Sequence, residues 1–375
     1  MRAYVYTDAS LERYAGRFVW LSINTEDAKN AAFLKKYPMP VLPTLIVLDA
    51  KRDAVAMRYI GGATVPQLHK MLDESGGHAP APSPADTLLT QGDKLASAGD
   101  PAGAALLYEQ ALDKAPKNWP RYGRAAESLV FSLALSSQNE RCITLARFLY
   151  PRVKGTVSAA NVASTGLGCA TGLDEKRSGR DEIIKELEVS TREVFDDAKV
   201  KLSGDDRSGL YIALIDARSS LKDEAGAKKL TEEWSAFLDG EAAKAKTPEQ
   251  RAVYDSHRLS AYLELGTPDK AIPMLEQSER DFPNDYNPPA RLTSAYKAMK
   301  KYAEALAASD RALAKAYGPR KLGMYTTRAD IYVEQGDKES AKKTLAEAIA
   351  YAKSLPDAQR NERRIASLEK RLAGM

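Results

Sequence analysis

Cysteine and histidine are scarce in this 375-residue chain, which contains two of the first and three of the second. Two cysteines are too few for the disulfide framework that supports small secreted domains. Neither residue type shows the close spacing of a zinc or haem site, so the sequence predicts no metal centre and no cofactor.

A concentration of one charge and a long apolar run are also lacking. The net charge is +4, and basic residues alternate with acidic ones instead of forming the basic stripe that binds nucleic acid. No apolar run approaches the roughly 18 residues of a membrane helix. The N-terminal residues are polar and do not form a secretory signal. The composition, 44% hydrophobic and 28% charged, is typical of a soluble protein of two or three domains.

Strand-like and helix-like patterns alternate in residues 1–74. Short apolar runs rich in β-branched and aromatic residues predict three strands, and a polar turn at 51–53 predicts that the last two are antiparallel. Two amphipathic stretches predict helices. The expected strands are 17–24, 44–49 and 54–60, and the expected helices are 25–36 and 64–73.

The stretch YPMPVLPTLIVLDA, residues 37–50, places Tyr37 five variable residues before Pro43 and Thr44 at the start of a strand. With the strand and helix before it and the IGGAT turn after the hairpin, it resembles the later part of a thioredoxin fold over residues 5–73. The resemblance implies a cis peptide bond before Pro43. It also implies an α/β domain that binds an extended substrate chain through Leu42, Pro43, Thr44 and Gly61. A proline that simply begins a strand, where no N–H donor is needed, is the alternative for Pro43.

The redox-active Cys-x-x-Cys of that family is missing. Residues 1–16, MRAYVYTDASLERYAG, resemble the end of the helix that carries it, which implies that the two cysteines and the first strands would precede Met1. We therefore expect an N-terminally incomplete thioredoxin-like domain that cannot turn over disulfides, derived from a thiol–disulfide oxidoreductase. A signal peptide upstream would place the protein in the periplasm or outside the cell.

Residues 75–86 are rich in proline, glycine, alanine and serine, which predicts a semi-stiff linker. The sequence beyond it is helical and repetitive. Small residues recur 34 and 36 positions apart at Ala271, Ala305 and Ala341, each preceded at a similar offset by a tyrosine. This pattern resembles the tetratricopeptide repeat and implies an all-α solenoid over 87–356. Clear repeats are expected near 85–118, 252–285, 286–319 and 322–356, degenerate repeats over 119–250, and a capping helix over 357–375.

The repeat resemblance implies that partner proteins or peptides bind the concave face that the first helix of each repeat lines. Four basic residues on those helices are the candidates: His257, Arg258, Arg291 and Arg328. A solvated helix face is the alternative for each of them. Two functions remain open at this point. The protein is a thioredoxin-family chain whose repeats recruit substrates, or it is a non-catalytic scaffold that uses the repeat groove and the Pro43 loop.

Cys142 occupies the position of a small contact residue, and Cys169 lies in GLGCATG, residues 166–172. We expect two small buried thiols, with a disulfide between adjacent repeats as the alternative. The glycines of GLGCATG follow no strand, so they predict close helix packing instead of a phosphate-binding loop.

Overall fold

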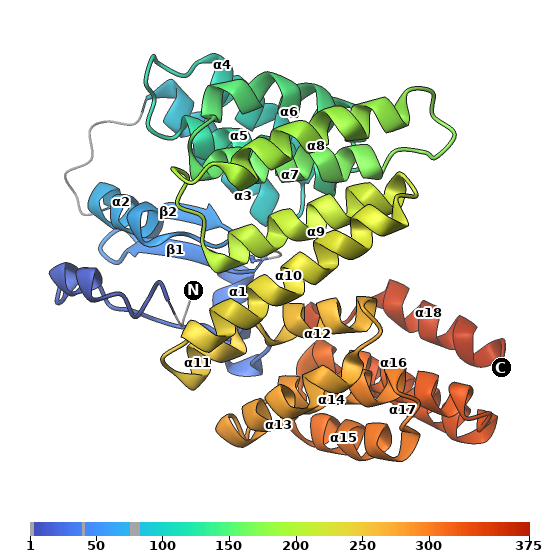
Figure 1. The fold of residues 1–375 in the computed structure, drawn as a ribbon. Coiled ribbons are helices and arrows are strands. Elements are labelled where there is room, and N and C mark those ends of the chain that lie inside the picture. The colour runs from blue at the N-terminus through green and yellow to red at the C-terminus, as the bar shows by residue number, and fades with distance from the viewer. Residues whose placement is uncertain (1–3, 40–41, 76–82) are drawn as a thin grey trace. The chain divides into compact units, whose positions relative to one another are not determined.

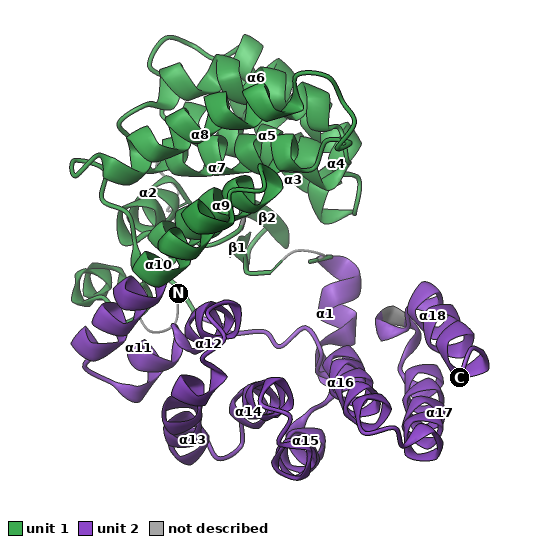
Figure 2. Cartoon of the chain, turned by 45° about the vertical axis from the view of Figure 1, so that its right-hand side comes forward, with its two compact units in different colours: residues 1–19, 38–234 green, residues 20–37, 235–375 purple. Residues whose placement is uncertain are grey.

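The computed structural model describes residues 4–39, 42–75 and 83–375 of the chain (Figure 1). Met1 and the centre of the expected linker, 76–82, lie outside the described residues. The chain divides into two compact units (Figure 2). Unit 1 comprises Met1–Val19 and Pro38–Trp234, and unit 2 comprises Trp20–Tyr37 and Ser235–Met375. This division cuts through the expected first domain, and the expected domain boundaries stay a prediction.

A small antiparallel hairpin opens unit 1. Strand β1, Thr44–Asp49, pairs with β2, Ala54–Ile60, with Thr44 opposite Ile60 at its open end. Both strands and their antiparallel pairing were expected, as was the helix that follows, α2, Val65–Ser75. The Leu42–Pro43 peptide bond is cis, as the thioredoxin resemblance implies.

The expectation of a strand over 17–24 is wrong. These residues form no strand, and Val19 and Leu21 expose 88% and 73% of their surface. A strand is stable only when a neighbouring strand bonds to it, and the sheet of the described residues consists of β1 and β2 alone. The helix expected over 25–36 is reduced to the turn η2, Ala28–Asn30, and the short helix α1, Ala31–Lys36. A two-stranded hairpin with these additions does not confirm a thioredoxin-like domain.

Antiparallel helix pairs make up the rest of both units, as Figure 1 shows. Seven such pairs follow one another in the described part of the chain. They are α3, Pro84–Ser97, with α4, Pro101–Asp113; α5, Tyr122–Leu135, with α6, Asn139–Val153; α7, Val157–Thr171, with α8, Arg180–Asp196; α9, Gly204–Ser220, with α10, Glu224–Lys244; α12, Asp255–Glu264, with α13, Ala271–Asp281; α14, Asn287–Ala298, with α15, Tyr302–Lys315; and α16, Lys321–Glu334, with α17, Lys338–Ser354. The remaining elements are η1, Ala9–Tyr14; α11, Pro248–Ala252; η3, Pro268–Lys270; η4, Gly318–Arg320; η5, Asp357–Gln359; and α18, Glu362–Ala373.

The connections inside the pairs share one backbone feature, although the connection between α7 and α8, residues 172–179, is longer than the others. One residue in each connection adopts a left-handed φ between 57° and 83°, and the residue five positions later is buried. The left-handed residues are Gly99, Ser137, Gly179, Lys222, Gly266, Lys300 and Gly336. The buried residues that follow are Ala104, Cys142, Ile184, Ala227, Ala271, Ala305 and Ala341. The same feature occurs in the three helix pairs of residues 119–250, where the sequence pattern is weak, and the degenerate repeats expected there stay a prediction.

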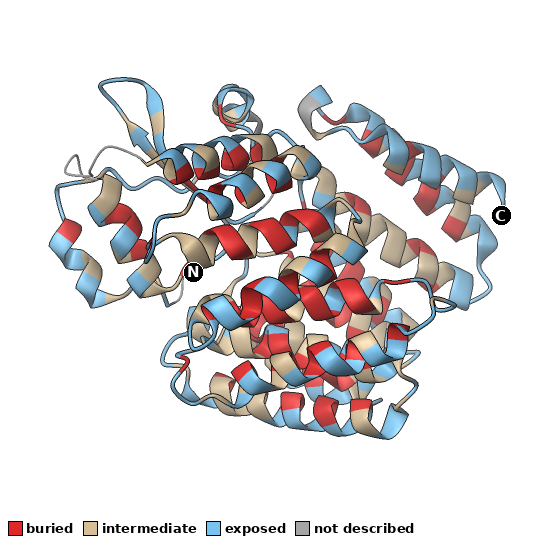
Figure 3. Ribbon diagram, turned by 90° about the horizontal axis from the view of Figure 1, so that it is seen from above, coloured by how far each residue is buried: buried red, intermediate tan, exposed pale blue. Residues whose placement is uncertain are grey.

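Buried residues form stripes along the facing sides of the paired helices (Figure 3). Small residues allow close approach at these contacts. A Cβ on Gly166 of α7 would lie 2.6 Å from the Cβ of Ala146 on α6, which confirms the expected packing role of this glycine.

Cys142 of α6 and Cys169 of α7 are joined by a disulfide, with their Cα atoms 6.3 Å apart. Both side chains are buried, as expected, but the expectation of two free thiols is wrong. The physical reason is the repeat packing itself. Cys142 occupies the small contact position of α6, and α7 packs against that side of α6, so the two sulfurs meet.

A buried polar cluster holds the hairpin against the first helices of unit 1. The Arg124 guanidinium of α5 donates to Asp93 Oδ2 at 2.7 Å and to the carbonyl of Arg58 in β2 at 3.0 Å. It also lies over the Tyr59 ring, 5.1 Å from its centroid. Tyr108 donates to the other Asp93 oxygen at 2.9 Å. Burial raises the pKa of Asp93 while Arg124 lowers it, so the carboxyl depends on this cation.

Glu127, one turn further along α5, is a second buried carboxyl. Its Oε1 has no hydrogen-bond partner, and burial raises its pKa although Ser158 and Asn161 bond to it. When a group has a raised pKa in the folded state, the protein loses stability as the pH rises through that pKa. Glu127→Gln removes this dependence. The free energy of unfolding of the variant, measured relative to the wild type, should therefore be higher at pH 8 than at pH 4. Urea titrations at both pH values measure this, with Glu347→Gln on the exposed side of α17 as the control. A constant difference would contradict the assignment.

Candidate partner-binding groove

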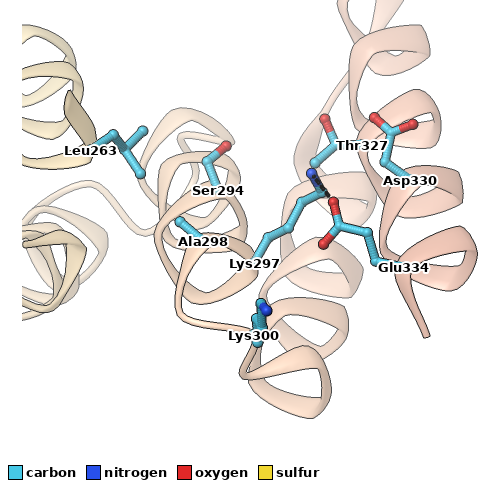
Figure 4. Close-up of a pocket in the computed structure, with 8 residues that line it drawn as sticks. All are labelled: Leu263, Ser294, Lys297, Ala298, Lys300, Thr327, Asp330 and Glu334. Carbon is cyan, nitrogen blue, oxygen red and sulfur yellow. Dashed lines mark ion pairs between the residues drawn. The ribbon is translucent and has the colours of Figure 1, made fainter. Parts of the chain in front are cut away.

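The first helices of three successive pairs in unit 2, α12, α14 and α16, line a hollow of about 430 Å³ (Figure 4). The repeat tyrosines Tyr262, Tyr296 and Tyr332 sit at equivalent positions on these helices. Most lining residues lie two before, one after or two after one of these tyrosines, which places them on a common face. We call this hollow the unit 2 groove. Its lining residues are Leu263, Ser294, Lys297, Ala298, Lys300, Thr327, Asp330 and Glu334.

The groove is polar and carries both charges. Lys297 Nζ lies 2.7 Å from Glu334 Oε1 across the hollow, as Figure 4 shows. Asp330 accepts from Arg371 of α18 at 2.5 Å. These ion pairs are partly exposed and contribute about 0–1 kcal/mol each to stability, so a ligand could replace their partners at little cost. The hydroxyls of Ser294 and Thr327 donate to carbonyls of their own helices, so they offer acceptors to a peptide.

Two of the four expected binding residues contact the preceding helix. Arg258 lies 2.8 Å from Asp239 of α10, and its guanidinium lies 6.0 Å from the centroid of the Tyr262 ring. Arg328 of α16 repeats this arrangement two helix pairs later: it pairs with Asp310 of α15 and lies 5.6 Å from the centroid of the Tyr332 ring. These two arginines stabilise contacts between successive pairs.

The other two expected residues, His257 and Arg291, are half-buried and do not line the groove. The positive charge of Arg291 acts on Asp255, a buried carboxyl that accepts from Ser278 at 2.6 Å and whose pKa is raised by burial. The role of all four residues in partner binding stays a prediction. Most of the lining residues lie at the few offsets from the repeat tyrosines given above, and this pattern is the sequence signal that points to them.

In unit 1 the structure brings together the four residues of the expected chain-binding loop. The Gly61 N–H donates to the Pro43 carbonyl at 2.8 Å, next to Thr44 at the open end of the hairpin. Leu42 exposes 51% of its surface beside them. Their role in binding stays a prediction.

Residues 322–354, which cover α16 and α17, match the family model described as tetratricopeptide repeat. The match covers the last of the seven helix pairs. A comparison with curated proteins found no match. No helix of the described residues is both long enough and apolar enough to span a membrane.

Several solved structures are similar to the chain. A tetratricopeptide repeat protein from Parabacteroides merdae is 15% identical, with 77% of this chain and 98% of that chain covered and a TM-score of 0.47. BtubC from P. vanneervenii is 14% identical, with 64% and 92% covered and a TM-score of 0.40. The TPR2AB domain of yeast Sti1 in a pHSP90 complex is 16% identical, with 77% and 98% covered and a TM-score of 0.29.

Proposed function

We propose that this protein is a non-catalytic interaction scaffold whose unit 2 groove binds a peptide segment of a partner protein. The observation that carries the proposal is the convergence of side chains from α12, α14 and α16 on one hollow. Repeat arrays bind ligands along surfaces of this kind because each first helix presents equivalent positions to the same side. The match of residues 322–354 to the tetratricopeptide repeat supports it.

The lining suggests the kind of peptide. Leu263 and Ala298 supply a small apolar area at one end, and the Lys297–Glu334 pair supplies both charges at the other. A segment with an apolar residue followed by charged residues of both signs would match this order. Peptides of that kind bind with modest affinity because ordering them costs conformational entropy.

Selection of random peptides on the intact protein tests the proposal, followed by binding of the selected peptides to two variants. Ala298→Arg fills the groove, and Ala346→Arg makes the same change on the exposed side of α17. We expect Ala298→Arg to weaken binding by about tenfold or more, a loss of about 1.4 kcal/mol or more. Ala346→Arg should leave binding unchanged. Equal binding by both variants would show that the peptides bind elsewhere.

A second binding role, for an extended chain at Leu42, Pro43, Thr44 and Gly61, is supported by the exposed Leu42 beside this cluster. A redox role for this chain has less support. Its two cysteines are buried and bonded to each other between α6 and α7, so they offer no exposed thiolate for exchange.

A further inference from the structure

Residues 20–37 form a part of unit 2 that has almost no core of its own. Helix α1 has no buried residue, and Leu21 is 73% exposed. A segment with so little buried apolar surface depends on specific polar contacts to stay in place. Two of these contacts are made by Glu26, whose side chain is only 16% exposed.

Glu26 lies against the turn between α15 and α16. Its Oε1 accepts from Arg320 Nε at 2.7 Å, and its backbone carbonyl accepts from the Gln359 amide at 2.8 Å. The Asn24 amide donates to the Tyr317 hydroxyl at 3.3 Å. Arg320 and Gln359 therefore bind the side chain and the backbone of Glu26, respectively, as in the recognition of an extended peptide.

The turn is shaped to receive this carboxylate. Gly318 has a φ of 55°, and a Cβ at this position would lie 3.2 Å from the Glu26 Cβ. Tyr351 donates to the Gly318 carbonyl at 3.3 Å and holds the turn from the other side. The second carboxylate oxygen, Glu26 Oε2, is buried without a hydrogen-bond partner. An unsatisfied buried oxygen carries a desolvation penalty, which weakens the contact and favours its release.

We propose that Arg320, Gln359 and Gly318 form a carboxylate-binding site for an extended acidic peptide, and that residues 24–26 are its intramolecular occupant. The site shares no residue with the unit 2 groove, so a test of this site does not depend on the proposed function. Release of Glu26 frees residues 20–37 and opens the site to an acidic segment of another chain.

Hydrogen–deuterium exchange of the full chain tests the first half of this proposal. Glu26→Gln keeps the shape of the side chain and removes its charge, so amides in residues 20–37 and in Gly318–Arg320 should exchange about threefold or more faster. Asp27→Asn is the matched control, because the Asp27 carboxylate lies 2.9 Å from Lys29 of the same segment. It should leave exchange in Gly318–Arg320 unchanged. Equal exchange in wild type and Glu26→Gln would overturn the proposal.

A synthetic peptide of residues 21–30, LSINTEDAKN, tests the second half. Added at millimolar concentration to the Glu26→Gln protein, it should restore slow exchange in Gly318–Arg320. The same peptide with glutamine in place of its glutamate should not. Failure of the first peptide, or equal protection by both, would show that the site does not recognise a carboxylate from another chain.

Discussion

Replacing Arg124 with methionine is expected to lower the free energy of unfolding by about 3–5 kcal/mol. Methionine keeps an unbranched apolar stem but lacks the guanidinium, so it leaves Asp93, which is 4% exposed, as a buried carboxylate without its cation. The β2 carbonyl that Arg124 also bonds loses its donor. Urea unfolding at pH 7, followed by circular dichroism, measures the loss.

A surface arginine provides the control for this variant. Arg141 lies 2.6 Å from Glu109, but both side chains are partly exposed, at 42% and 35%. Arg141→Met should therefore cost no more than about 1 kcal/mol. The loss in free energy of unfolding caused by Arg124→Met should also become smaller in acid, because a protonated Asp93 needs no cation. Losses of the same size in the two variants would mean that the Asp93 cluster does not hold the hairpin.

Removing the Cys142–Cys169 disulfide is expected to have a comparable effect. The bond closes a loop with a sequence separation of 27, and a loop of this length corresponds to about 3–4 kcal/mol of stability. The double variant Cys142→Ala/Cys169→Ala should unfold at correspondingly lower urea concentration. The alanines suit the buried contact position, which Ala104 and Ala271 occupy in other pairs.

Thiol titration decides whether the bond exists in the isolated protein. Wild-type protein that is denatured without reductant should show no free thiol, and reduced protein should show two. The double variant should have the same stability with and without reductant, whereas the wild type should lose stability when reduced. Two free thiols in the unreduced protein would contradict the disulfide.

The helix pairs could be predicted from the sequence because their signals are local. Ala271, Ala305 and Ala341 recur at the repeat interval, and each is fully buried at a contact between helices. The β1–β2 hairpin was likewise predictable, since two apolar runs flank a short polar turn. Over residues 119–250 the turn geometry persists at Ser137 and Lys222, although neither is a glycine.

The rest depended on long-range partners. The run at 17–24 has the composition of a strand, but composition does not supply the neighbouring strand that it needs. The groove was missed for a related reason. Arg258 and Arg328 have the charge expected of a binding site, yet Asp239 and Asp310 from preceding helices pair with them. Glu26 shows no signal at all in the sequence, because Arg320 lies 294 positions away.

Locating a selected peptide on the intact protein tests whether the unit 2 groove is the binding surface. Hydrogen–deuterium exchange with and without the peptide does this for every helix at once. We expect slower exchange in α14 and α16, over the turns that carry Ser294, Lys297 and Asp330, with no change in the second helices of the pairs, α13, α15 and α17. Protection confined to those second helices or to the β1–β2 hairpin would contradict it.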